Sequence, residues 1–191
     1  IVEEYYWDGY PQKDSAPYSL AKRMLVVQAM AYAQQYNFES VVIIPGNVYG
    51  PHDNFNLRDA HVIPALVRKF VECKEPIEIW GDGKATRDFV YVTDVANGAL
   101  KAMMNGESGS LYNISGGKEY SINQVVEHLV RISGYKGTLL YDDNKPKGQS
   151  RRLFSIDKAQ SQLGYGPKVD LESGLTLTFE WLKTAEEDVR H

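Results

Sequence analysis

The sequence predicts an α/β fold from three observations. Segments with helical spacing of apolar residues alternate along the chain with short β-branched runs. Several of those runs stop at glycine or proline, as buried strands commonly do. The chain has 191 residues, of which 43% are apolar and 24% are charged, enough for a sizeable buried core. These values exclude global disorder and suit one large domain or slightly more.

The first elements expected are a loop, a helix and a strand. Residues 1–17 are rich in Pro, Gly, Asp and Tyr, which favours a loop. A helix is predicted over residues 17–36, because apolar and aromatic residues from Met24 to Tyr36 recur at spacings of three and four. Residues 39–45 have the short β-branched run that is typical of a buried strand.

The rest of the chain repeats this alternation. The N-caps are expected to be Thr93 and Ser121, because hydroxyl side chains accept hydrogen bonds from free N–H groups at a helix start. Gly134 is expected to end the helix that Ser121 begins. The predicted elements, in order, are loop 46–60, helix 61–73, strand 77–80, strand 88–92, helix 94–104, strand 111–114, helix 122–132, strand 138–141, basic loop 144–152, helix 156–163 and helix 171–185.

Net charge, cysteine content and the length of apolar runs limit which kinds of function the chain can have. The net charge is −4, which argues against a nucleic-acid-binding groove but leaves room for a local basic pocket. Cys73 is the single cysteine, so no internal disulfide forms, and a reducing, cytoplasmic setting is the simplest interpretation. No run of 18 apolar residues occurs, so we expect no membrane span. We predict no metal site.

Tyr18 and Lys22 are the first candidates for chemistry. Residues four apart on a helix lie on one face, about one turn apart. A cation beside a phenol favours the tyrosinate, so Lys22 is expected to lower the pKa of Tyr18 and make it a usable proton donor or acceptor. A half-buried tyrosine beside a solvated lysine is the alternative for this pair.

A glycine-rich turn that would hold a dinucleotide is missing from the sequence. Such a turn joins a strand to a helix whose N-terminal amides bind the pyrophosphate. Gly81 and Gly83 precede neither a third glycine nor a long helix. We therefore expect the residues that bind the cofactor phosphates to lie outside these 191 residues.

The segment that follows the predicted strand 39–45 carries the most specific signal. It reads N-V-Y-G-P-H-D-N-F from Asn47 to Phe55, and H-V-I-P-A-L follows from His61. Together with Y-x-x-x-K at Tyr18 and R-D-F at Arg87, these residues resemble the extended short-chain dehydrogenase/reductase family, and within it the GDP-L-fucose synthases. The resemblance runs from about Glu3 to Trp181, and it corresponds to the C-terminal portion of such enzymes.

This resemblance implies a fold in two parts. Residues 1–60 would be the tail end of an NADP-binding Rossmann-type doubly wound sheet. Residues 61–191 would form mainly a smaller α/β substrate-binding domain, with segments that return to the Rossmann part. The serine and cysteine that such enzymes use before the tyrosine would precede this chain, and Cys73 lies in the wrong place to be that cysteine.

The resemblance also implies roles for individual residues. Tyr18 would protonate the C4 oxygen of the sugar during reduction, Lys22 would hold the nicotinamide ribose, and His61 would be the acid of epimerisation. The nicotinamide end of NADPH would be lined by Tyr18, Lys22, Pro45, Gly46, Asn47, Val48 and His61. The GDP-sugar would be contacted by Asn47, Lys69, Trp80, Arg87 and Arg152.

Other interpretations of these residues stay open. Trp80 suits core packing equally well, Arg87 and Arg152 suit a solvated surface, and His61 suits a helix cap. The function implied is an NADPH-dependent epimerase/reductase that acts on a GDP-4-keto-6-deoxymannose in the cytoplasm as a homodimer. The alternatives are another nucleotide-sugar 4-epimerase or 4,6-dehydratase, and a catalytically silent nucleotide-sugar-binding fragment. We expect the isolated chain to be inactive.

Overall fold

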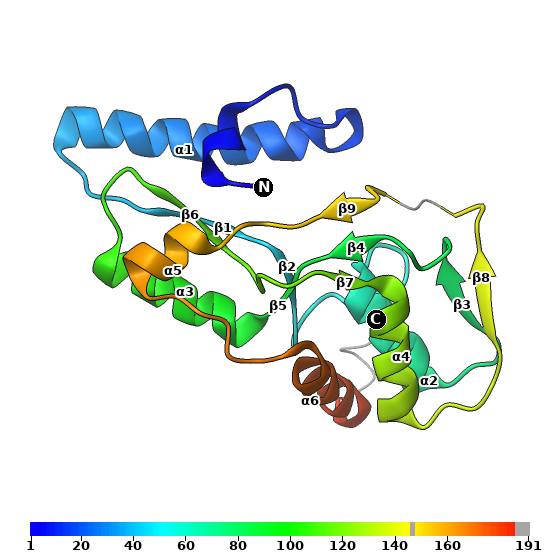
Figure 1. Cartoon of the computed structure of the whole chain (residues 1–191). Coiled ribbons are helices and arrows are strands. Elements are labelled where there is room, and N and C mark those ends of the chain that lie inside the picture. The colour runs from blue at the N-terminus through cyan, green and yellow to red at the C-terminus, as the bar shows by residue number, and fades with distance from the viewer. Residues whose placement is uncertain (146–147, 186–191) are drawn as a thin grey trace.

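The computed structural model describes residues 1–145 and 148–185, and it confirms the predicted α/β class. Helices and strands alternate along the chain, as Figure 1 shows. The elements are η1 Glu3–Trp7, η2 Lys13–Ser15, α1 Ala16–Tyr36, β1 Val42–Pro45, β2 Asn47–Tyr49, α2 Val62–Glu72, β3 Ile77–Trp80, β4 Thr86–Arg87, β5 Phe89–Tyr91, α3 Val92–Asn105, β6 Leu111–Ile114, β7 Tyr120–Ser121, α4 Ile122–Ser133, β8 Leu139–Asp142, β9 Arg151–Arg152, α5 Asp157–Leu163 and α6 Leu171–Thr184.

One part of the molecule is a layered α/β arrangement around β1 and β6. These strands pair in parallel, with Val42 opposite Leu111 and Pro45 opposite Ile114. Helices α3 and α5 pack against β6, while α1 lies on the other side of the strand pair (Figure 1). A small apolar cluster fills the space under α3 and α5, and its buried members are Ala102, Tyr112, Ile114, Ile156, Ala159, Leu163 and Tyr165.

The chain leaves this layer through Gly46, which joins β1 to β2. Strand β2 pairs in parallel with β5, with Asn47 opposite Phe89. A Cβ atom on Gly46 would lie 1.9 Å from Oγ of Ser115, the residue that follows β6. Only glycine therefore allows the end of β1 to approach the end of β6 this closely.

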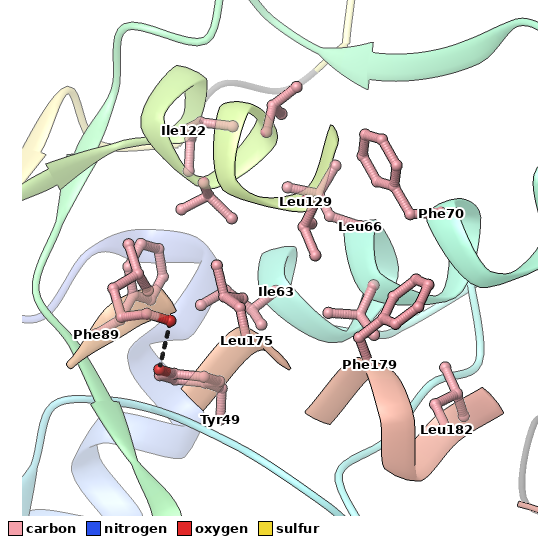
Figure 2. Packing of buried hydrophobic residues seen from close by; sticks show 14 of the residues in the cluster. Tyr49, Ile63, Leu66, Phe70, Phe89, Ile122, Leu129, Leu175, Phe179 and Leu182 are labelled. Atoms are coloured by element: carbon pink, nitrogen blue, oxygen red, sulfur yellow. Dashed lines mark hydrogen bonds between the residues drawn. The ribbon is translucent and has the colours of Figure 1, made fainter. Parts of the chain in front are cut away.

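The second part is built on three helices, α2, α4 and α6, which pack on one another. Figure 2 shows Leu66 and Phe70 of α2, Ile122 and Leu129 of α4, and Leu175, Phe179 and Leu182 of α6 in the shared core. Strands β3 and β8 pair in parallel, and β4 lies between β7 and β9 in a small mixed sheet. The core fixes α2, α4 and α6 relative to one another.

The helix ends confirm some predicted caps and correct another. Ser121 and Gln124 form a reciprocal capping box at the start of α4, and Gly134 ends that helix in the left-handed conformation, as predicted. The prediction of Thr93 as an N-cap is wrong. Helix α3 begins directly after β5, its N-cap is Tyr91, and no side chain caps it. The strand runs into the helix without the intervening residue that a Thr93 cap would require.

Three expected loops contain short elements. Residues 1–17 include η1 and η2, and Glu3 of η1 is buried and accepts a hydrogen bond from the Asn113 backbone at 2.7 Å. Loop 46–60 begins with β2, and loop 144–152 ends with β9. Strand β4 was not expected. Strands of two or three residues are too short for alternation to be visible in the sequence. Pro146 and Lys147 of the basic loop lie outside the described residues.

Helix α1 confirms the predicted helix but not a buried apolar face. Its large apolar side chains are exposed on the chain, with Met24 at 55%, Leu25 at 57% and Tyr36 at 64%. Its buried residues are Ala16 and Val26. Among the described residues, no helix combines the length and the hydropathy that crossing a membrane requires.

Candidate active site

A cavity of about 890 Å³ opens where β1 ends and β2 begins, and we call it the main cavity. Its walls are the segment after β1, the start of α2, the first turns of α1, and the β4–β9 pair. Eight of the residues predicted for the site line it, namely Tyr18, Pro45, Gly46, Asn47, Val48, His61, Arg87 and Arg152.

A second cavity of about 580 Å³ holds most of the remaining predicted residues, and we call it the side cavity. Lys69 and Trp80 line it, together with Arg87. Arg87 and Val62 line both cavities, so the two spaces are neighbours. Lys22 lines neither of these two cavities within the described part of the chain.

Tyr18 and Lys22 lie on the same side of α1, as their spacing predicted. The ammonium nitrogen of Lys22 is 5.5 Å from the centre of the Tyr18 ring. The Tyr18 side chain is 69% exposed on this chain. Its ring is therefore largely exposed where it lines the main cavity, and the lysine charge lies close to the ring.

Asn47 is held by a buried carboxylate. Its Nδ2 donates to the backbone oxygen of Asp88 and to Oδ1 of Asp88, each at 3.0 Å. Asp88 is fully buried and also accepts hydrogen bonds from Ser115 Oγ and from the Phe154 backbone. Burial raises the pKa of Asp88, and these hydrogen bonds oppose that shift because they stabilise the carboxylate.

His61 occupies the N-cap position of α2 and is exposed to the main cavity. Asp53 lines the same cavity, and burial raises the pKa of its carboxyl group while its bond to the Asn54 backbone and the nearby His61 oppose the shift. His52, also on this wall, has a left-handed backbone with φ of 66° and a ring centre 4.7 Å from that of Trp181. Both histidines therefore line the main cavity, and His52 also packs against Trp181 of α6.

Two arginines face the main cavity from neighbouring strands. Arg87 of β4 is opposite Arg152 of β9 in the parallel pairing. Burial and the positive charge of Arg152 together lower the pKa of Arg87. Arg151 points elsewhere, with Nε and Nη2 on the Glu119 carboxylate at 2.8 and 3.0 Å. The alternation of β9 therefore separates one arginine that is paired on the protein from one that faces the cavity.

The side cavity has an apolar floor and a rim of cations around Trp80. The Trp80 side chain is 50% exposed, and the ammonium groups of Lys69 and Lys145 lie 5.8 and 5.6 Å from its ring centre. Lys69 donates to the backbone oxygen of Glu78 at 2.7 Å, and burial lowers its pKa. An exposed indole ring flanked by cations can stack on a planar group that carries negative charge.

Sequence reasoning missed several residues of these walls. Asp53 lay inside the H-D-N-F segment without an assigned role, Glu78 gave no signal beyond its membership of a strand, and Lys145 was placed in the basic loop without a role. Asp88 stood in the R-D-F triplet without a role. Among the described residues, no group of three or more His, Cys, Asp or Glu side chains is placed to hold a metal ion.

Comparison with known proteins identifies the family. The pattern of the NAD dependent epimerase/dehydratase family matches residues 3–115, which include Tyr18, Asn47, His61 and Arg87. The chain belongs to this family. A GDP-L-fucose synthase from Sinorhizobium fredii is 35% identical over 184 residues, which is 94% of this chain and 58% of that protein.

Solved structures agree with this assignment. A GDP-L-fucose synthetase from Naegleria fowleri superposes with a TM-score of 0.89 at 30% identity, covering 100% of this chain and 62% of that one. A UDP-glucose 4-epimerase from Thermotoga maritima, solved with UDP-glucose, gives a TM-score of 0.79 at 31% identity, covering 92% and 59%. The predicted resemblance to fucose synthases and the predicted Rossmann-type fold are thereby confirmed. This epimerase/dehydratase chain spans about half to three-fifths of the length of the curated fucose synthases that it matches.

Proposed function

We propose that the polypeptide containing this chain is an NADPH-dependent epimerase/reductase that converts GDP-4-keto-6-deoxy-D-mannose to GDP-L-fucose. The observation that carries the proposal is the main cavity itself. It gathers a tyrosine, a histidine, an asparagine and two arginines from separate segments of the chain around one space. Those side chains supply a proton donor, a second acid, an orienting amide and an anion site.

Tyr18 serves the reduction step. A ketone at C4 becomes an alcohol when a hydride reaches the carbon and a proton reaches the oxygen, and nicotinamide chemistry supplies the hydride when NADPH is bound. Tyr18 donates the proton, and the positive charge of Lys22 stabilises the tyrosinate that remains. The wall formed by Pro45, Gly46, Asn47 and Val48 suits a flat ring, because it offers backbone and small side chains beside Tyr18.

His61 serves the epimerisation steps. A C4 ketone acidifies the hydrogens at C3 and C5, so each centre inverts when a base removes one proton and an acid returns another to the opposite face. An imidazolium N–H can deliver that proton, and His61 is exposed to the cavity where the sugar would lie. The base would come from outside residues 1–191.

The GDP moiety extends from the main cavity into the side cavity. Arg87 and Arg152 bind the diphosphate, because paired guanidinium groups match phosphate oxygens in charge and geometry. Trp80 stacks on the base or ribose, and Lys69 lies beside it. Since Arg87 lines both cavities, it stands at the passage between sugar and nucleotide.

A homodimer through α1 accompanies this function. The exposed apolar side chains of that helix, Met24 and Leu25 among them, support an interface that removes them from water. The setting is the cytoplasm, where GDP-sugars and NADPH would be available to the enzyme.

A second candidate is a 4-epimerase or 4,6-dehydratase that acts on another nucleotide sugar. The fold likeness to a UDP-glucose 4-epimerase supports it. Such enzymes recycle a bound NAD instead of consuming NADPH, so cofactor turnover distinguishes the two. A third is a silent module that binds a nucleotide sugar without catalysis.

The test is a cofactor-balance assay on the complete polypeptide. With GDP-4-keto-6-deoxymannose, we expect one NADPH oxidised for each GDP-L-fucose formed. Conversion of UDP-glucose or another nucleotide sugar without net NADPH consumption would replace the proposal with the second candidate. Binding of GDP without turnover of any substrate would favour the silent module.

A further inference from the structure

Asp88 joins the separate walls of the main cavity at one buried point. Its side chain is 0% exposed, and it lies between β4 and β5. One carboxylate oxygen accepts from Asn47 Nδ2 at 3.0 Å, while the other accepts from the Phe154 backbone at 3.0 Å and from Ser115 Oγ. The three donors come from β2, from the residue after β6, and from the segment after β9.

The hydrogen bonds of Asn47 determine what its amide offers to a ligand. A primary amide has two N–H donors and one carbonyl acceptor. Nδ2 of Asn47 donates to two oxygens of Asp88, the backbone oxygen and Oδ1, each at 3.0 Å. Rotating the amide by a half turn would bring its oxygen against those two acceptor oxygens. The chemistry therefore fixes the orientation and leaves Oδ1 of Asn47 as the atom available to a ligand.

Asp88 also connects this amide to the arginine pair. It follows Arg87 directly in the chain, and its backbone N–H donates to the Arg152 oxygen at 3.3 Å. Phe154, which its side chain binds, lies two residues after Arg152. One buried residue thus ties the segment beside Tyr18 to the strands that carry the cavity arginines.

We propose that Asp88 is a positioning residue that fixes the polarity of Asn47, so that the site presents an acceptor to a hydroxyl or amide N–H of the bound ligands. This inference rests on the proposed function for its kinetic test. It adds the requirement that the ligand carry a hydrogen-bond donor at this position, which the shape of the cavity alone would not impose.

The decisive variant is Asp88→Asn in the complete polypeptide. The Phe154 backbone N–H cannot rotate away, so the oxygen of the substituted amide stays on it and the new NH₂ group faces Asn47. Two donors then oppose each other, so Asn47 keeps only its bond to the backbone oxygen of residue 88 and its amide is no longer held in one orientation. We expect kcat for NADPH oxidation to fall about 100-fold, the loss typical of a misplaced reacting group. GDP affinity should change little, because the bond to Phe154 that supports the arginine strands is kept.

Two further variants separate positioning from a general loss of structure. Ser115→Ala removes one hydrogen bond of Asp88 but leaves both bonds to Asn47, so kcat should fall far less than in Asp88→Asn. The double variant Asn47→Asp with Asp88→Asn restores a donor facing an acceptor at the side-chain contact and keeps an acceptor at the cavity, while the bond to the backbone oxygen of residue 88 stays lost. It should recover about tenfold of kcat over Asp88→Asn, as expected for directly coupled residues.

A measurement independent of activity completes the test. In polypeptide labelled with ¹⁵N-asparagine, the side-chain amide of Asn47 should exchange its protons slowly in the wild type and rapidly in Asp88→Asn. Unchanged exchange, or equal losses of kcat and GDP affinity in Asp88→Asn and Ser115→Ala, would overturn the positioning role. If the wild type turns over no substrate, the proposed function fails. If its Asn47 amide still exchanges more slowly than that of Asp88→Asn, the positioning role of Asp88 stands.

Discussion

Arg87 offers a prediction in which binding and stability respond differently to one substitution. We consider Arg87→Met, which keeps most of the aliphatic stem and removes the charge. In the folded chain, burial and the charge of Arg152 lower the pKa of Arg87, although Asp88 opposes this. The guanidinium is charged at neutral pH in both the folded and the unfolded chain, and folding places that charge in a less favourable setting. Its removal also costs the bond from Nη1 to the Thr86 backbone oxygen, so the two effects oppose each other and Tm should change little.

The effect on GDP follows from the bonds that would be lost. A hydrogen bond to a charged group contributes about 1.5–3 kcal/mol, which corresponds to a factor of about 10 to 150 in Kd. Arg87→Met should therefore weaken GDP binding by about 10- to 150-fold in isothermal calorimetry on the complete polypeptide. The salt dependence of binding should also become weaker, since one cation fewer meets the diphosphate.

Arg151→Met is the matched control. It removes the same side chain from the neighbouring position on β9, but that guanidinium is bonded to Glu119 and lines neither the main nor the side cavity. GDP affinity should stay close to that of the wild type. Equal weakening of GDP binding by both substitutions, or a clear fall of Tm in Arg87→Met alone, would refute the assignment of Arg87 to the anion site.

Further predictions concern the framework. Leu129→Ala leaves a cavity at a side chain that is 0% exposed, so urea unfolding should show a loss of about 2–5 kcal/mol; a loss well below that range would mean that the helix core is loosely packed. In Gly174→Ala, the new Cβ would lie 2.1 Å from the Tyr49 hydroxyl oxygen, which should cost about 1–3 kcal/mol, partly recovered in a Tyr49→Phe background. No recovery there would contradict the clash. The bond from Arg151 holds the pKa of Glu119 at about 2, below its usual 4.5, so its contribution to stability is present above pH 4.5 and is lost as the pH falls towards 2. Glu119→Gln should flatten the stability profile between those pH values, and an unchanged slope would exclude the pair.

Much of the fold was predictable from long segments with periodic apolar residues and from the residues that begin and end helices. The helix at α4 could be delimited at both ends, because Ser121 and Gly134 act through contacts within a few residues. The short strands β2, β4 and β9 escaped prediction, since they exist only through pairing with distant segments. Thr93 failed as a cap for the same reason, because the run of β5 into α3 is set by the sheet.

The residues of the candidate site also divide into those that local motifs reveal and those that depend on distant contacts. Tyr18, His61 and the segment from Asn47 were found because they lie in local motifs. The role of Asp88 was not found from the sequence, since its partners Ser115 and Phe154 are 27 and 66 positions away along the chain. Whether Trp80 packs in a core or faces a ligand was also undecidable from spacing, and its 50% exposure beside two lysines favours the ligand.

The central claim is that Tyr18 is the proton donor of a reductase, and one comparison tests it most directly. Single-turnover oxidation of NADPH by the complete polypeptide, with GDP-4-keto-6-deoxymannose, would be followed for the wild type and for Tyr18→Phe. The account predicts a loss of about 100-fold to 10,000-fold in the rate of oxidation, the range that general acid catalysis contributes. Rapid oxidation by Tyr18→Phe, at a rate near that of the wild type, would contradict it.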